Sequence, residues 1–576
     1  MPIHNEDIAA AFDEFADLLA LSGENQFRIR AYRHAAEVLR SLSEPLSRRI
    51  AGGFDPDTLP GVGADLAGKI RELATTGRCA ALERLRATVP PGLRELLFLP
   101  DVGPQRARAL HEALDIRSLE DLRVAIEQHR VRKVPRFGVK LENRLAESLA
   151  TLAQRGKRFH WSVADRYARA LERHLASLPG VLQVAIAGSY RRGRETVGDL
   201  DVVVAAQPGT DVDSALRQYE ETKATLVSGP TRSSVVLRNG LQVDLRVVPA
   251  ASFGAALYYF TGSKDHNIRL RTQAAALGLK INEYGVFRGS ECIGGSTEGS
   301  VLATLGLPYI EPELREDRGE FEAAVAGRLP RLIAGVDLRG DLHAHTSATD
   351  GTATLAGMAR AARAAQLRYL AITDHSRYLG AVHGLDAAAL AAQIGQIDAF
   401  NASARGITLL KGVEVDILED GSLALPDEIL GRLDLVVGAV HSHFTLSRRR
   451  QTERLLRALD HGYLSILAHP SARLIDQREP IDCDWPTVFR AAAERPCFLE
   501  INAQPSRLDL NDLMAREAAS AGVRFCIASD AHGVGDFELL AGGVRQARRA
   551  WLEASQVINT QPLAQLRRTL RRTFLK

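Results

Sequence analysis

The chain has 576 residues, 45% of them hydrophobic and 25% charged, and a formal net charge of +3 at pH 7. This length is enough for several domains of ordinary globular composition. The balanced charge excludes a global field that would attract a polyanion, so that any such attraction must come from local basic clusters. The five scattered cysteines form no CxxC pair, the N-terminus is polar and acidic, and no apolar run reaches transmembrane length. We therefore expect a cytoplasmic protein without a disulfide framework.

Residues 1–150 are predicted to be helical, with two amphipathic segments followed by glycine-containing turns. In Leu59-Pro-Gly-Val-Gly-Ala-Asp, Gly61 and Gly63 would form a tight turn whose N–H groups, beside a helix N-terminus, can bind phosphate. A second copy, 99–107, contains Gly103, and a weaker third copy covers 134–140. The pattern resembles a helix-hairpin-helix, a module that binds the DNA backbone without reading sequence. A single hairpin of this kind could be simple helix packing, whereas repeated hairpins favour contact with a DNA backbone.

Two details of this segment leave the hairpin interpretation open. Asp101 and Arg136 stand where the first glycine of the second and third hairpins is expected, and Asp101 would repel phosphate. Five basic residues close together in the sequence would suit DNA binding, although an ordinary solvent-exposed helix face explains them nearly as well. The members of this basic cluster are Arg130, Arg132, Lys133, Arg136 and Lys140.

Residues 151–318 alternate predicted strands and helices, and one loop among them concentrates charged side chains. The loop begins at Gly188-Ser189 after an apolar run and ends at Asp199 and Asp201, which open the next run. Residues i and i+2 of a strand share a face, so this carboxylate pair can hold divalent cations. The free N–H and hydroxyl groups at the loop start, with Arg191, Arg192 and Arg194, can bind phosphate. A solvated turn is the alternative; a phosphate clamp beside a carboxylate pair would suit metal-dependent nucleotidyl transfer.

The full string, Gly-Ser-x-Arg-Arg-(x)6-Asp-x-Asp, resembles the signature of the nucleotidyltransferase superfamily, and specifically of family X DNA polymerases. The resemblance covers residues 1 to about 315 and predicts a third carboxylate, for which Asp244 in the strand-like run 241–248 is the candidate. Asp199, Asp201 and Asp244 would then hold two Mg²⁺ or Mn²⁺ ions that bind a dNTP and activate the primer 3′-hydroxyl, with Asp244 nearest to that hydroxyl.

The same resemblance implies further contacts. Tyr259 and Phe260 would pack against the incoming sugar, Asn267 would reach the base and Arg271 the template strand. Ser189, Arg192 and Gly198 would bind the β- and γ-phosphates, Gly188 and Gly262 would complete the nucleotide site, and Gly61, Gly63 and Gly103 would contact DNA. Lys69, with Tyr32 nearby, stands where related repair enzymes carry the Schiff-base nucleophile of a lyase. That chemistry needs a lowered lysine pKa, and a simple phosphate contact is the alternative.

Residues from about 311 to 335 are charged and punctuated by proline and glycine, which predicts a linker over 319–335, and beyond it a different pattern begins. Histidines and carboxylates collect at the ends of seven apolar, strand-like runs with helical stretches between them. This layout is typical of a β/α barrel with its site on one face. His343-x-His345 would put two imidazoles on one side of a strand, which suits a metal ion.

The C-terminal string resembles the polymerase-and-histidinol-phosphatase (PHP) domain, and the resemblance covers residues 336 to about 570. Nine positions match its ligand set: His343, His345, Asp350, His375, Glu414, His441, His469, Asp530 and His532. The resemblance implies up to three ions of Mn²⁺, Zn²⁺ or Fe²⁺ and phosphoester hydrolysis. His383, His443 and Arg507 match no ligand position and are left as candidate substrate contacts.

Together these patterns predict a multidomain α and α/β protein. Its expected parts are a helix-hairpin-helix domain (1–90), a second hairpin subdomain (91–150), a nucleotidyltransferase palm with thumb (151–318), a linker (319–335) and a distorted (β/α)7 PHP barrel (336–576). The expected function is gap-filling DNA polymerisation from dNTPs on gapped or primed DNA, by a monomer without membrane contact. A 3′→5′ exonuclease in the barrel, with trimming of blocked or abasic ends, would serve base excision repair or end joining.

Three alternatives remain open from the sequence. The chain could be a DNA-binding phosphoesterase with weak or lost polymerase activity, a phosphatase of small phosphomonoesters, or a non-enzymatic DNA-binding scaffold. The complete carboxylate triad argues against the first, and two complete metal constellations argue against the third.

Overall fold

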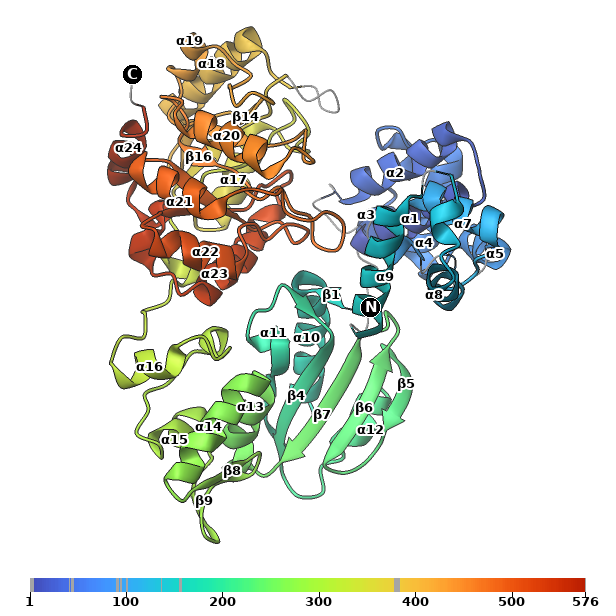
Figure 1. The fold of residues 1–576 in the computed structure, drawn as a ribbon, viewed down its shortest axis with the longest axis vertical. Coiled ribbons are helices and arrows are strands. Elements are labelled where there is room, and N and C mark those ends of the chain that lie inside the picture. The colour runs from blue at the N-terminus through green and yellow to red at the C-terminus, as the bar shows by residue number, and fades with distance from the viewer. Residues whose placement is uncertain are drawn as a thin grey trace.

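A computed structural model describes residues 5–40, 42, 46–89, 93, 96–99, 102–135, 137–154, 158–377 and 384–574, so that Asp101, Arg136 and His383 lie outside the described residues. Three lobes follow one another along the chain: a helical lobe, a central lobe built on a sheet, and a C-terminal barrel (Figure 1). Within the described ranges, no helix is long and apolar enough to cross a membrane.

The N-terminal lobe is a bundle of helices around an apolar core. Phe12 and Phe15 of the first helix pack on Tyr32 of the second, with ring centroids 5.5 and 4.9 Å apart, and all three side chains are buried. The helices are α1 (Asn5–Leu21), α2 (Gln26–Arg40), α3 (Leu46–Ala51), α4 (Ala64–Thr76), α5 (Ala80–Thr88), α7 (Pro104–Leu114), α8 (Leu119–Glu127) and α9 (Val139–Gln154).

Three hairpins of the same construction recur in this lobe. Each has a 3-10 turn, a backbone hydrogen bond between residues three apart, and a glycine just before the next helix. The turns are η1 (Pro56–Thr58), η2 (Leu96–Phe98) and η3 (Val131–Lys133). The hydrogen bonds join the N–H of Val62, Val102 and Phe137 to the C=O of Leu59, Leu99 and Val134, at 3.1, 3.0 and 2.9 Å. The glycines are Gly63, Gly103 and Gly138, and Gly61 in the first turn has φ +67°. The third hairpin is therefore as regular as the first, because the buried apolar pair of each turn fixes it.

The central lobe is organised by a five-stranded sheet in the order β2-β4-β7-β6-β5. The strands are β2 (Val181–Ile186), β4 (Asp199–Ala206), β5 (Thr222–Val227), β6 (Arg232–Leu237) and β7 (Gln242–Val248). Only the β4–β7 pair is parallel, and its register sets Asp201 directly beside Asp244. The middle of β4 is buried on both faces: Val202 and Val204 pack under α10 (Trp161–Ala176), and Val203 packs under α13 (Phe253–Thr261).

The rest of the central lobe is a smaller unit beside α13. It contains α14 (Lys264–Ala276), the antiparallel strands β8 (Lys280–Asn282), β9 (Gly285–Arg288) and β10 (Glu291–Gly294), then α15 (Glu298–Ala303), η5 (Pro312–Leu314) and α16 (Glu320–Val325). Helix α16 falls inside the segment 319–335, which the sequence predicted as a linker. Phe321 and Ala324 are buried in the core of this unit, so that this part of the segment belongs to the fold.

A buried ion cluster joins this unit to the main sheet. Glu298 accepts hydrogen bonds from Arg191 at 2.7 Å on both carboxylate oxygens and from Arg315 at 2.7 Å. Arg191 lies in α11 (Gly188–Arg191), and the Arg315 side chain is fully buried. Burial opposes ionisation of Glu298, but the two arginines outweigh it and lower its pKa to about 2. The cluster therefore fixes the loop after β2 against α15.

We expect Glu298→Gln to destabilise the central lobe, because it leaves a fully buried guanidinium without a compensating charge, at a cost of about 3–5 kcal/mol. Urea denaturation at pH 7 measures this. The depressed pKa means that the carboxylate stabilises the fold above its unfolded pKa of about 4.5 and loses this effect as the pH falls toward about 2. The difference between wild type and variant should shrink in that window. Glu322→Gln, which removes an exposed partner of Arg269, should cost far less stability; equal losses in the two variants would contradict the prediction.

The C-terminal lobe is a barrel of parallel strands wrapped by helices. The strands are β11 (Gly340–Asp341), β12 (Tyr369–Ile372), β13 (Thr408–Lys411), β14 (Glu414–Asp416), β15 (Val437–Ala439), β16 (Ile466–Leu467), β17 (Phe498–Asn502) and β18 (Phe525–Ala528). They form two sheets, β11-β12-β13 and β14 through β18 in sequence order. Parallel bridges between His375 and Glu414, and between Ala344 and Ala531, join the two sheets at both seams. Because β13 and β14 are two halves of one run, this is the predicted distorted seven-stranded barrel.

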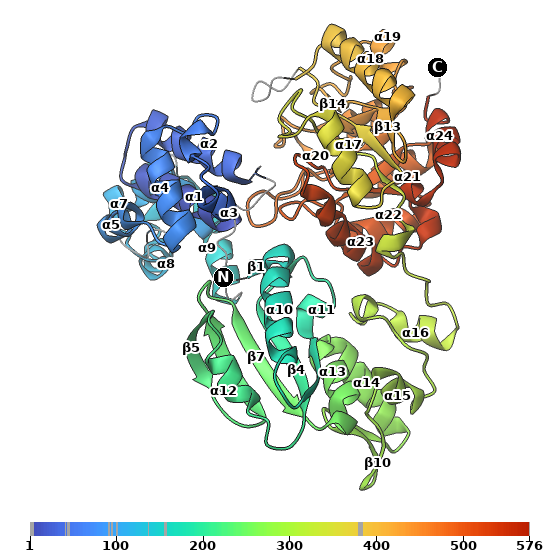
Figure 2. The same ribbon diagram turned by 180° about the vertical axis from the view of Figure 1, so that it is seen from behind.

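Helices cover the barrel in the expected alternation. They are α17 (Leu355–Ala364), α18 (Ala387–Ser403), α19 (Asp427–Leu430), α20 (Arg448–Leu459), α21 (Trp485–Glu494), α22 (Asp512–Ser520), α23 (Leu540–Arg549) and α24 (Leu563–Arg571). Leu566 and Leu570 of α24 join the apolar interior of the barrel, together with Tyr369 and Leu435. In both ribbon views α22 and α23 lie at the edge of the barrel nearest to α11 of the central lobe (Figures 1 and 2).

Two candidate metal centres

The first candidate site is a cluster of three carboxylates on β4 and β7. Asp199 and Asp201 share a face of β4, and Asp244 lies beside Asp201 in the parallel register. Burial, and then the charges of the neighbouring aspartates, raise the pKa of Asp201 to about 7 and also raise that of Asp199. Gathering like charges in a half-buried place is unfavourable unless cations compensate them. An all-oxygen donor set of this kind fits hard divalent cations such as Mg²⁺ or Mn²⁺.

A cavity of about 430 Å³ adjoins two of these carboxylates, and Asp244 is not among its lining residues. It is lined by Asp199 and Asp201, by every residue predicted for the nucleotide except Gly198, and by Arg271. Sequence reasoning missed two further lining residues, Arg158 and Lys264, which carry positive charge but belong to no recognisable motif. Asn267 donates a hydrogen bond from Nδ2 to the Tyr259 carbonyl at 2.7 Å, which ties two of the predicted contacts together. The cavity therefore joins carboxylates, basic groups and aromatic rings in one place.

The two adjacent arginines of the loop have different roles. Arg192 lines the cavity, as expected of a phosphate contact. Arg191, which the sequence offered as a second phosphate donor, is instead held by Glu298 and by the hydroxyl of Thr261. Since α11 is helical, consecutive side chains point in different directions, and only one of the two arginines faces the cavity.

Both the backbone conformation at position 188 and the neighbouring Asp201 side chain require a glycine there. Its φ is +64°, and a Cβ at this position would lie 2.3 Å from Oδ2 of Asp201. We expect Gly188→Ala to abolish any activity that depends on Asp201 while leaving the chain folded, because the added methyl group displaces the carboxylate. Gly395→Ala, at a helical position with open space around it, is the matched control. A Gly188→Ala protein as active as this control would show that Asp201 tolerates displacement.

Lys69 in the first hairpin helix is paired with a carboxylate. Its Nζ lies 2.5 Å from Oδ1 of Asp65 and 5.8 Å from the ring centroid of Tyr32. Burial opposes the charge, but Asp65 and Tyr32 outweigh it and raise the pKa of Lys69. A Schiff-base nucleophile needs the opposite shift, so that this arrangement favours the simple phosphate contact. In the basic cluster of the third hairpin, Arg132 pairs with buried Glu142 at 2.6 Å, which makes this arginine partly structural.

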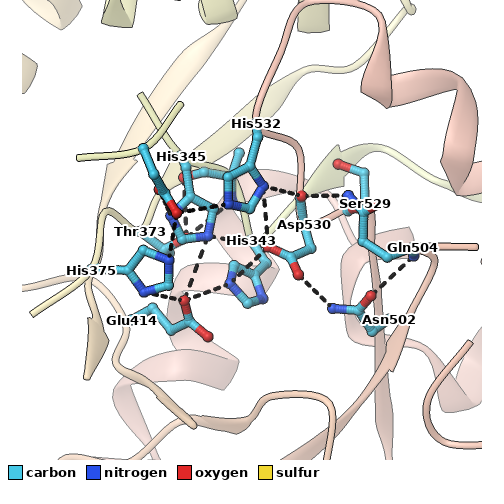
Figure 3. Close-up of polar contacts among 12 residues, drawn as sticks. His343, His345, Thr373, His375, Glu414, Asn502, Gln504, Ser529, Asp530 and His532 are labelled. Carbon is cyan, nitrogen blue, oxygen red and sulfur yellow. Dashed lines mark hydrogen bonds and ion pairs between the residues drawn. The ribbon is translucent and has the colours of Figure 1, made fainter. Parts of the chain in front are cut away.

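The second candidate site lies where the barrel strands end. Three groups of side chains there have ligand atoms close enough to share an ion, among the residues that the structure describes. The groups are His345, Asp350, His375 and His532; His343, His345 and Asp530; and His375, Glu414 and His441. They contain every predicted ligand except His469, whose Nε2 lies 3.0 Å from Oε1 of Glu414. Figure 3 shows His343, His345, His375 and Glu414 pointing toward one another.

Glu414 lies at the centre of this cluster, within ion-pair distance of several histidines. Its carboxylate lies 2.8 Å from Nδ1 of His375 and 3.2 Å from Nε2 of His441. Burial opposes ionisation of Glu414, but the charges of the surrounding imidazoles hold its pKa well below its ordinary value. Conversely, Glu414 and Asp350 outweigh burial and raise the pKa of His375 to about 11. The cluster therefore favours positive charge at its centre, which bound cations would supply.

The ring nitrogens are also arranged for metal binding. Nδ1 of His343 lies 2.7 Å from Glu500, and its Nε2 is buried without a hydrogen-bond partner among the described residues. Nδ1 of His345 is likewise buried without such a partner within those ranges. A neighbouring carboxylate that takes one ring N–H leaves the other nitrogen to a metal ion. Imidazole and carboxylate ligands together fit transition-metal ions such as Mn²⁺, Fe²⁺ or Zn²⁺.

Sequence reasoning missed the carboxylates behind the ligands. Glu500 also accepts a hydrogen bond from the N–H of His469 at 2.7 Å, and Oδ1 of Asp416 lies 3.0 Å from Nδ1 of His441. Both carboxylates orient ligand histidines. The available signal was an acidic residue inside an otherwise apolar strand, as in Phe498-Leu-Glu-Ile. Of the other candidate contacts, His443 is exposed with its Nδ1 3.7 Å from Glu419, and the charge of Arg507 contributes to the lowered pKa of His469, after burial.

We expect Glu414→Gln to reduce the metal content of the barrel strongly, because the carboxylate that joins its ligands loses its charge. Metal analysis of purified protein after gel filtration measures the change per chain. Glu428→Gln, which alters an exposed carboxylate on α19, is the control and should retain wild-type content. Unchanged content in Glu414→Gln would remove Glu414 from the ligand set.

Known protein families match segments in each of the three lobes. Family profiles match the chain as a helix-hairpin-helix domain (3–79), a tandem helix-hairpin-helix (93–151), a DNA polymerase beta palm (163–255), a DNA polymerase beta thumb (256–316) and a PHP domain (341–486).

Three relatives show how far the similarity extends. The chain is 36% identical over 574 residues to the DNA polymerase/3′-5′ exonuclease PolX of Bacillus subtilis, which covers 99% of this chain and 100% of that protein. It is 26% identical over 345 residues to DNA polymerase lambda of Rattus norvegicus, which covers 54% and 56% of the two chains. A probable phosphatase of Thermoanaerobacter matches the chain at 31% identity over 232 residues, which covers 38% of this chain and 89% of that protein.

The fold and the two sites define a class of protein in which a nucleotidyltransferase palm is followed by a PHP-type metal centre. Within that class, the chain belongs to the bacterial family X DNA polymerases that carry a C-terminal PHP domain.

Proposed function

We propose that this protein is a DNA-directed DNA polymerase that fills short gaps, with a 3′→5′ exonuclease in its PHP domain. The observation that carries the proposal is the pairing of two chemically different metal sites in one chain. One has three aspartates beside a basic cavity, and the other has the histidine-rich cluster around Glu414. Both sites suit phosphoester chemistry, one its formation and the other its hydrolysis.

In the polymerase half, the residues act by binding and orientation. Asp199, Asp201 and Asp244 would hold two divalent ions, whose chemistry when bound would be Lewis-acid activation of the primer hydroxyl and compensation of the triphosphate charge. Arg192, with Ser189 and the backbone of Gly188 and Gly198, binds phosphate oxygens. Tyr259 and Phe260, whose rings meet edge to face at 5.2 Å between centroids, form the wall against the sugar and exclude a 2′-hydroxyl.

The helical lobe holds the DNA. The three hairpins present backbone N–H groups at helix starts, which contact phosphates without selecting a base sequence. Gly61, Gly63 and Gly103 allow the backbone to approach the DNA closely, and Arg271 contacts the template strand beside the cavity. We assign Lys69 to a phosphate contact, since its pKa is raised.

In the barrel, the nine ligands would hold up to three ions, of which Mn²⁺ or Zn²⁺ suits the imidazole-rich donor set. Such ions would supply the Lewis acidity that phosphoester hydrolysis at neutral pH needs. Glu500 and Asp416 keep the ligand histidines in the required orientation. We propose Mg²⁺ or Mn²⁺ at the aspartates, gapped or primed DNA and dNTPs as substrates, a monomeric state and a cytoplasmic location.

The two activities can be separated on one 5′-labelled primer in a single-nucleotide gap. We expect wild type to extend the primer with dNTPs present and to shorten it with Mn²⁺ alone. Asp244→Asn should lose extension and keep shortening, while His343→Ala should do the reverse, so that each variant is the folding control of the other. Absence of extension by wild type would refute the polymerase assignment.

A second candidate function for the barrel is hydrolysis of small phosphate monoesters, which the similarity to a probable phosphatase favours. Release of phosphate from p-nitrophenyl phosphate, compared with release of nucleotides from the labelled strand, distinguishes the two. We expect the DNA strand to be the better substrate. A barrel that hydrolyses the monoester and leaves the strand intact would be a phosphatase.

A further inference from the structure

Helix α23 of the barrel lies between the two candidate metal centres. Near its start, η7 (Asp536–Leu539) provides Asp536, whose carboxylate accepts the N–H of His532 and of Gly533, both at 2.9 Å. At its far end, Arg545 and Arg549 contact the central lobe. In both ribbon views this helix lies at the barrel edge facing α11 (Figures 1 and 2).

Arg549 bridges three segments that are far apart in the sequence. Its Nη1 donates to the carbonyl of Arg192 at 2.8 Å and to Oε1 of Glu316 at 2.9 Å. Its Nη2 donates to Oδ2 of Asp512, on α22, at 2.7 Å. The side chain is only 2% exposed, so that these contacts are made away from water.

Glu316 forms ion pairs with two arginines. The same oxygen, Oε1, that accepts from Arg549 also accepts from Nε of Arg192 at 3.1 Å. Nη1 of Arg192 donates to the carbonyl of Thr261 at 2.5 Å. The guanidinium proposed to bind the triphosphate is therefore held on the cavity wall by a carboxylate that a barrel residue shares.

Further contacts with the barrel hold the loop between α11 and β4 in place. The Arg545 guanidinium stacks 3.9 Å from the ring centroid of Trp161. Its side chain passes under Gly193, where a Cβ would lie 2.6 Å from Cγ of Arg545. Arg473 of the barrel pairs with Glu195 at 2.7 Å. The loop from α11 to β4 thus rests on the barrel through its backbone and its side chains.

We propose that Arg549 is a positioning residue for nucleotide binding: by sharing Glu316 and holding the Arg192 carbonyl, it keeps the Arg192 guanidinium available to the triphosphate. This inference rests on the proposed role of Arg192. A largely buried carboxylate left with a single cationic partner binds that partner more tightly. Without Arg549, Glu316 would compete with the triphosphate for Arg192.

Steady-state gap filling tests this with Arg549→Met. We expect the KM for the dNTP to rise roughly tenfold while kcat changes less than about twofold, because binding is weakened and the aspartates are untouched. The double variant Arg549→Met/Glu316→Gln should return the KM to within about threefold of Glu316→Gln alone, because the competing carboxylate is gone. Arg549→Lys, which keeps the charge, should give an intermediate KM.

Arg548→Met is the matched control. Arg548 is the preceding residue of the same helix and pairs with Glu313 at 2.6 Å, also across the two lobes, without contacting Arg192. Its KM should stay at the wild-type value, and Mn²⁺-dependent shortening of the primer should be the same in both variants.

The outcomes separate the two proposals. If wild type does not extend a primer, the polymerase assignment fails and the positioning role of Arg549 with it. If wild type extends normally but Arg549→Met has an unchanged KM, the positioning role alone is wrong. That role is also wrong if Arg548→Met raises the KM equally, or if the effects of Arg549→Met and Glu316→Gln simply add, since a purely structural contact would behave in those ways.

Discussion

A carboxylate removed from water has to be compensated by positive charge, and both halves of this molecule are arranged around that constraint. Glu298 is compensated by two arginines and fastens the smaller unit to the sheet. Glu414 is compensated by a ring of imidazoles at the centre of the barrel. Asp199, Asp201 and Asp244 face one another, with raised pKa values at two of them. Glu298 and Glu414 have cationic partners within the protein. The three aspartates have too few such partners, and two of them line a cavity.

The sequence was sufficient for the parts of each centre that depend on periodicity along a strand. Asp199 and Asp201 lie two residues apart, and the barrel ligands lie at strand ends, so that the side-chain direction follows from local geometry. The identity of Asp244 needed the family resemblance, because strand pairing joins residues that are distant in the chain. Its register beside Asp201 is a property of the sheet.

The features that the sequence did not predict depend on three-dimensional packing. Nothing in the pair Arg191-Arg192 indicates which guanidinium faces the cavity, since the turn of α11 and the position of Glu298 decide it. Glu500 supports two histidines from other strands. The third hairpin matched its pattern weakly because the pattern emphasises glycine, whereas buried apolar pairs fix the turn. Contacts between the lobes, such as that of Arg549 with Arg192, leave no local signal at all.

The two sheets of the barrel meet where the predicted metal ligands lie. At one junction Glu414 donates its N–H to the Thr373 carbonyl and accepts from the N–H of Ser376, on either side of His375. At the other, the N–H of His345 donates to the Ala531 carbonyl, between Asp530 and His532. The backbone hydrogen bonds that close the barrel are therefore made by ligand residues and their immediate neighbours. A substitution that disturbs the closure of the barrel would also displace the ligands, so that the architecture of the barrel and its chemistry depend on the same few residues.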